Sequence, residues 1–102
     1  MLFKISGKHV DIPVALKSYA EEKASKLPRF YNVINKVEVV IDGKEGSDYT
    51  VEVIARAEHK KVFVVKEKCG DVYAAIDLAT HKLEQQLRKI KKKERNKKHR
   101  SR

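Results

Sequence analysis

Lysine and arginine are the side chains with the clearest chemical potential in this sequence. They number 24 against 14 Asp and Glu, for a net charge of +10. The excess gathers at the C-terminus, where residues 91 to 102 hold eight Lys or Arg and one Glu, a net of +7. Such a run favours a polyanionic partner, with nucleic acid the first candidate and an anionic membrane the second. A solvated tail without a partner is the alternative.

Signatures of catalysis are missing. The sequence has no G-x-G-x-x-G, G-x-x-x-x-G-K-[ST], H-E-x-x-H or G-x-S-x-G motif. Cys69, beside Lys68 and near a helix start, could be a nucleophile, but a small residue in a tight turn is the favoured interpretation. The histidines never stand at metal-ligand spacing; they are His9, His59, His81 and His99. We therefore expect no enzyme activity, no cofactor and no metal.

A single cysteine excludes an internal disulfide framework and suits a reducing compartment. No apolar run approaches a membrane span, and the N-terminus MLFKISGKHV is too short and too alternating for a signal peptide. The sequence thus predicts a cytoplasmic protein.

The segment from Asp71 to Lys93 organises the predicted elements, because it has the apolar period of a helix that covers a core. Its seam spans an arc of about 80°, formed by Val72, Ile76, Ala79, Leu83, Leu87 and Ile90. Asp71 is a good N-cap. The cations lie off the seam: Lys82, Lys89 and Lys93 on one flank, and His81, Arg88 and Lys92 roughly opposite.

The N-terminal part predicts a strand over Leu2 to Ser6, closed by Gly7, and a helix over Val14 to Leu27. Asp11 would cap this helix with Pro13 in its first turn, and Pro28 would stop it. The apolar face consists of Leu16, Tyr19, Ala20, Ala24 and Leu27.

Three further strands are expected, over Lys36 to Asp42, Tyr49 to Ala57 and Val62 to Lys66. The inward face of VFVV cannot be read because every position is apolar. The fold class is therefore α+β, with the order β-α-β-β-β-α, a four-stranded mixed sheet in the order 1-2-3-4 and both helices on one face. Residues 1–93 would form one domain and residues 94–102 a basic, disordered tail.

With both helices on one face, Lys17, Lys23, Lys26 and Arg29 would lie beside Lys82, Lys89 and Lys93 and form one basic surface for phosphates. The alternative is that lysines merely coat the solvent side of amphipathic helices. Phe30 or Tyr31 could stack on an unpaired base, although plugging the end of a helix is the favoured role. The meander followed by a helix resembles a double-stranded RNA-binding domain, but the lysines lie at the end of the last helix, which argues against the same docking.

Three segments, GKHVDIPVAL, KASKLPRF and DVYAAIDLATHKLEQQLRKIKKK, resemble the ribosome hibernation promoting factor and ribosome-associated inhibitor A family, also called the sigma-54 modulation or S30EA family. The resemblance implies a stress or stationary-phase protein that binds the 30S subunit and its 16S rRNA, covers the mRNA and tRNA sites and inhibits translation. It implies no small-molecule substrate, no membrane and a monomer off the ribosome. With the basic face of the last helix, it assigns RNA binding to Lys8, Lys17, Lys23, Lys26, Arg29, Lys82, Arg88, Lys89, Lys91, Lys92 and Lys93.

The sequence departs from that family in three respects. Pro13 stands where relatives often have a capping Ser or Thr, the tail is basic where some inhibitor-type members are acidic, and the extra C-terminal domain of long members is missing. Whether the chain is a short form or the N-terminal part of a long one stays open. The alternative function is a general structured-RNA-binding domain without ribosome specificity.

Overall fold

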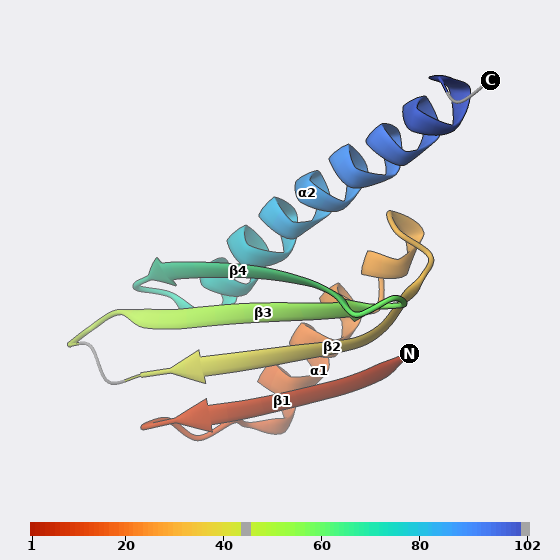
Figure 1. Cartoon of the computed structure of the whole chain (residues 1–102). Coiled ribbons are helices and arrows are strands. Elements are labelled where there is room, and N and C mark those ends of the chain that lie inside the picture. Colours follow the sequence, from red (N-terminus) through yellow and green to blue (C-terminus); the bar gives the residue numbers. More distant parts are fainter. Residues whose placement is uncertain (44–45, 101–102) are drawn as a thin grey trace.

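A four-stranded sheet covered on one face by two helices forms the body of the protein (Figure 1). The computed structural model describes residues 1–43 and 46–100, with side chains as far as residue 94. In chain order the elements are β1 (Leu2–Lys8), α1 (Val14–Ala24), a 3-10 turn η1 (Leu27–Arg29), β2 (Ile34–Asp42), β3 (Tyr49–Ala57), β4 (Lys61–Cys69) and α2 (Val72–Arg100). The predicted α+β class and element order are confirmed.

The strands lie in the predicted order β1-β2-β3-β4, with β1 parallel to β2 and the other pairs antiparallel. Alternation fixes the buried face: Val39 of β2 pairs with Val53 of β3, which pairs with Val65 of β4, and all three are buried. Val62 and Val64 point to the other side and are exposed. In the segment VFVV, Phe63 and Val65 therefore face the core, which the sequence alone could not show because all four residues are apolar.

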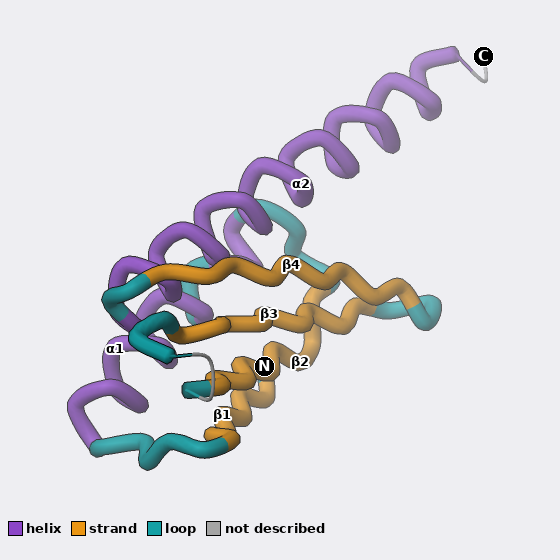
Figure 2. The backbone as a smooth tube through the Cα atoms, turned by 90° about the vertical axis from the view of Figure 1, so that its left-hand side faces the viewer, coloured by secondary structure: helices purple, strands orange, loops and turns teal. Residues whose placement is uncertain are grey.

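Both helices pack on this buried face (Figure 2). The seam predicted for α2 is confirmed, since Ile76, Ala79, Leu83 and Leu87 are fully buried. Asp71 caps the helix as expected: its Oδ1 accepts a hydrogen bond of 3.0 Å from the backbone N–H of Tyr73. The hydroxyl of the buried Thr80 donates to the Ile76 carbonyl at 2.8 Å, so this polar side chain has a partner inside the core.

The predicted start of α1 at Val14 is confirmed, but its predicted cap and its predicted end at Leu27 are wrong. The helix begins at Val14 with Pro13 at its N-cap position, and no side chain caps it, so Asp11 does not have the predicted role. Pro13 disfavours helical backbone geometry at the residue before it, Ile12. Ile12 and Asp11 therefore stay outside the helix. At the other end α1 stops at Ala24, and Pro28 lies inside η1. Proline lacks the N–H that would have bonded to the carbonyl of Ala24.

Helix α2 projects well past the end of the sheet (Figure 1). Its backbone is helical through Arg100, beyond the boundary at residue 93 that the sequence suggested for the domain. Residues 101 and 102 of the predicted tail lie outside the described residues. The division into a domain and a disordered tail stays a prediction.

Candidate nucleic-acid interface

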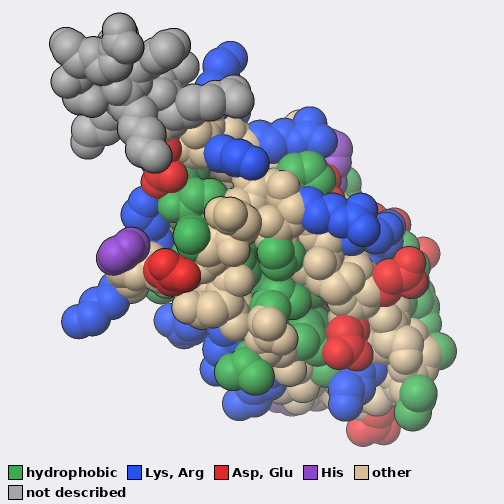
Figure 3. Space-filling view, turned by 90° about the vertical axis from the view of Figure 1, so that its right-hand side faces the viewer, with side chains coloured by type: hydrophobic (Ala, Val, Ile, Leu, Met, Phe, Trp, Pro, Cys, Tyr) green, Lys and Arg blue, Asp and Glu red, His purple; other side chains and the backbone are tan. Residues whose placement is uncertain are grey.

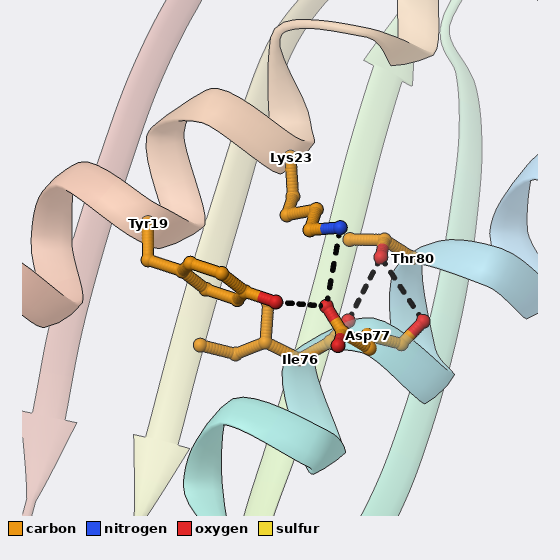
Figure 4. A network of polar contacts seen from close by, with 5 residues as sticks. All are labelled: Tyr19, Lys23, Ile76, Asp77 and Thr80. Carbon is orange, nitrogen blue, oxygen red and sulfur yellow. Dashed lines mark hydrogen bonds and ion pairs between the residues drawn. The ribbon is translucent and has the colours of Figure 1, made fainter.

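Asp77 of α2 joins the two helices (Figure 4). Its Oδ1 accepts a 2.6 Å hydrogen bond from the Tyr19 hydroxyl of α1 and lies 3.4 Å from Lys23 Nζ. The hydrogen bond to this carboxylate, together with burial, raises the pKa of Tyr19, and the charge of Asp77 raises the pKa of Lys23. The ring of Tyr73 packs edge-on against Tyr19, with centroids 5.0 Å apart. Lys23 is therefore already engaged in holding α1 against α2.

Beyond this contact, cations gather where η1 meets α2. A hollow of about 300 Å³ is lined by Phe30 and by a basic cluster, here called the η1 cluster, of Arg29, Arg88, Lys91 and Lys92. The Arg88 guanidinium carbon lies 4.8 Å from the centroid of the Phe30 ring, a cation–π contact that orients the side chain. Lys and Arg side chains lie at several places on the face seen in Figure 3, both above and below its central hydrophobic area. The η1 cluster thus presents four cations from two elements to one site.

The groove between α1 and α2 next to the η1 cluster is of mixed charge. Lys23 of α1 and Lys26, which directly precedes η1, line it on one side, but Asp77 and Glu84 line it from α2, together with His81. Carboxylates repel phosphates and offset the lysines at short range. Along the groove between α1 and α2, the net positive charge is therefore greatest at the η1 cluster, away from Asp77.

The other flank of α2 lies over β4. Lys82 Nζ pairs with Glu67 Oε2 of β4 at 2.7 Å, and Lys89 and Lys93 line a hollow beside Phe63 of the same strand. The prediction that these three lysines lie beside those of α1 is therefore wrong. At about 100° per residue they fall on one side of the buried seam, while Arg88 and Lys91 fall on the side that meets η1. Cations thus line both flanks of α2.

Two predicted RNA-binding residues lie apart from both flanks. Lys8 of β1 pairs with Asp42 of β2 and lies on the uncovered face of the sheet, where it lines a shallow hollow that extends across to Lys68 of β4. Lys17 is exposed on α1, and helical geometry puts it on the opposite side of the buried line of Leu16 and Ala20 from Lys23. Neither is brought to the η1 cluster.

A second polar contact, which the sequence did not predict, links α2 to the rest of the protein. Glu94 Oε2 accepts hydrogen bonds from the Tyr31 hydroxyl at 2.9 Å and from Lys61 Nζ at 2.6 Å. Glu94 raises the pKa of Lys61, chiefly through that hydrogen bond, and the Tyr31 hydroxyl adds to the shift. The sequence feature that could have indicated this contact is that Glu94 is the single acidic residue in a run of basic ones. Tyr31 is 5% exposed and buried in the core, so it has the predicted plugging role and no free ring face for a base.

The described part of the chain offers no competing chemistry. It contains no group of three or more His, Cys, Asp or Glu side chains that could hold a metal ion. Neither of its helices has the length and apolarity needed to cross a membrane. Cys69 is half-buried at the end of β4. Binding through cations is the chemistry that the described surface supports.

A family model described as Sigma 54 modulation protein / S30EA ribosomal protein matches residues 3–95. The chain belongs to this family. A ribosome hibernation promoting factor of Azotobacter vinelandii is 38% identical over 102 residues, which cover 92% of the chain and 86% of that protein. A ribosome hibernation promotion factor of Staphylococcus aureus (strain COL) is 35% identical over 90 residues, covering 87% of the chain and 47% of that protein. The chain thus spans about half the length of the latter relative.

Two solved structures share the fold. The N-terminal domain of Thermus thermophilus Protein Y has a TM-score of 0.78 at 28% identity, over 87% of this chain and 97% of that one. A ribosomal subunit interface protein from Coxiella burnetii has a TM-score of 0.77 at 26% identity, over 89% of this chain and 98% of that one. The prediction that the chain is not an enzyme is confirmed by its family, whose members named above are hibernation factors.

Proposed function

We propose that this protein is a ribosome hibernation factor of the cytoplasm, which binds the 30S subunit through 16S rRNA, covers the mRNA and tRNA sites and inhibits translation under stress or in stationary phase. The observation that carries the proposal is the η1 cluster, because four converging cations on an orienting aromatic ring suit a phosphate backbone. The names of the relatives from Azotobacter vinelandii and Staphylococcus aureus support the ribosome as partner.

The contact surface in this proposal is α2 from Lys82 onward, with its two flanks. Arg29, Arg88, Lys91 and Lys92 contribute from the η1 side, and Lys82, Lys89 and Lys93 from the β4 side. Lys23 of α1 and Lys26 before η1 extend it, and residues 94–102 add charge to the domain of residues 1–93. Lys8 and Lys17 lie at its periphery or beyond. The protein acts as a monomer before it reaches the ribosome and needs no small-molecule substrate.

Co-sedimentation with purified 30S subunits tests the proposal. The wild-type protein should appear with the subunit at low salt, and a variant carrying Arg29→Glu, Lys91→Glu and Lys92→Glu should be lost from that fraction. A control with Lys4→Glu, Lys36→Glu and Lys66→Glu changes the net charge equally on the uncovered sheet face, so it should bind nearly as the wild type does. Equal loss in both variants would mean that only overall charge matters.

A competition experiment separates ribosome binding from general RNA binding. Duplex RNA in molar excess over ribosomal phosphate should not displace the protein from 30S subunits if the surface fits the ribosome. Equal affinity for any duplex would instead support the general RNA-binding alternative. In cell-free translation, the protein at a stoichiometric ratio to ribosomes should reduce synthesis, and the η1-cluster variant should not.

A further inference from the structure

The hollow on the β4 flank of α2 has a composition unlike the rest of the basic surface. It measures about 380 Å³, within the range of small-ligand sites, and is lined by Phe63, Gln86, Lys89, Ile90, Lys92 and Lys93. Phe63 and Ile90 are partly buried against the core, so they form a fixed apolar floor. The lysines and the amide of Gln86 are exposed around it. An apolar floor with a cationic rim fits a ligand with a flat apolar part and a negative charge.

Phe63 differs from the other aromatic rings near these cations. A lysine or arginine lies over Phe30 at 4.8 Å, over Tyr19 at 5.4 Å and over Tyr31 at 5.7 Å, measured to the ring centroids. Among the residues that the structure describes, no cation lies over the Phe63 ring, whose recorded ring contact is an edge contact with Tyr31 at 5.8 Å. The ring of Phe63 therefore contributes aromatic surface to an open hollow among lysines.

We infer that this hollow holds an unpaired nucleotide of RNA, with its base against Phe63 and its phosphates on Lys89 and Lys93. The inference rests on the proposed function and adds a base-contacting site to it. A base in a duplex has both faces covered by its neighbours, and the deep groove of A-form RNA excludes side chains, so the occupant must be unpaired. The Gln86 amide can donate to or accept from a base edge. A carboxylate can pair with the lysines but is repelled by the negative face of an aromatic ring, so an acidic segment without apolar side chains would not use Phe63.

Binding of a six-nucleotide single-stranded RNA tests this site, with a blunt-ended RNA duplex compared at equal phosphate concentration. Phe63→Leu keeps the apolar volume but removes the ring, so it should weaken hexanucleotide binding by about five-fold or more, given the usual energy of base stacking on an aromatic side chain. Binding of the duplex should not change. Phe3→Leu is the matched control, since Phe3 is also a partly buried aromatic at the core but lies on β1.

The hexanucleotide should also shift the NMR signal of the Ile90 methyl group in the wild-type protein, a readout that needs no variant to fold. Phe63→Tyr should retain affinity because it retains the ring. Unchanged hexanucleotide binding by Phe63→Leu, an equal loss of duplex binding, or an equal shift of the Ile90 signal by hexaglutamate would overturn the inference. If one of these results is obtained and the protein still binds 30S subunits, only the nucleotide site is refuted. If the protein binds the hexanucleotide as expected but does not bind 30S subunits, the proposed function is refuted instead.

Discussion

Leu83 and Leu78 lie on the same helix but differ in burial. Leu83 is fully buried, whereas Leu78 is 43% exposed. Leu83→Ala should lower the free energy of unfolding by roughly 2–5 kcal/mol, because it removes buried methyl groups and leaves a cavity. The same substitution at Leu78 should change it by about 0.5 kcal/mol or less. Denaturant unfolding of the two variants measures both values, and equal stability would show that the seam of α2 does not carry the core.

Gly7 lies inside β1, whereas the sequence predicted that it ends the strand. A Cβ atom there would approach the Val10 carbonyl oxygen to 2.5 Å, whereas at Gly70 the nearest atom, Asp48 Oδ1, would be 3.7 Å away. Gly7→Ala should therefore destabilise the protein by roughly 1–3 kcal/mol, the usual cost of overpacking. Gly70→Ala should be neutral or slightly stabilising. Thermal melts of the pair provide the test, and a neutral Gly7 variant would mean that the turn after β1 yields easily.

Asp77 gives the contact between α1 and α2 a dependence on alkaline pH. The pKa values of Tyr19 and Lys23 are raised in the folded chain above their ordinary 10.0 and 10.5. The folded state therefore binds these two protons more tightly than the unfolded state does. Their contribution to the free energy of unfolding is complete below about pH 10 and is lost as the pH rises through the raised pKa values.

Asp77→Asn removes the cause of both shifts. Its stability deficit relative to the wild type should be largest near about pH 8 and shrink above about pH 10. Other titrating groups, including the Lys61 pair with Glu94, are common to both proteins and cancel in the difference. Urea unfolding of both proteins at the two pH values measures this gap, and a gap independent of pH would refute the assigned role of Asp77.

For the whole molecule, the number of cations on α2 and η1 predicts a steep salt dependence. If about six phosphates are contacted, affinity for a duplex RNA should fall roughly a thousandfold between 50 and 200 mM salt. Fluorescence anisotropy across that range gives the slope. The η1-cluster variant should show a slope lower by about three phosphate contacts, while the uncovered-face control should keep the wild-type slope. A shallow slope for the wild type would exclude phosphate contacts as the main source of affinity.

The sequence by itself determined the element order, the sheet order, the buried faces of β2 and β3, the seam of α2 and its Asp71 cap. These features depend on local period and on hydrogen bonding within one turn. It predicted the start of α1 at Val14 but not its cap or its C-terminal end, because the effects of Pro13 and Pro28 compete with the cap signal of Asp11 and with an apolar period that continues to Leu27.

Only the tertiary structure decided which neighbour lies on each flank of α2. A helical period specifies the face that is buried, but it carries no information on whether α1 or β4 lies to either side of that face. That placement put Arg88 and Lys91 beside η1, and Lys82 and Lys89 over β4. It also joined Glu94 to Tyr31 and Lys61, residues far apart in the chain, because long-range contacts follow from packing and not from spacing.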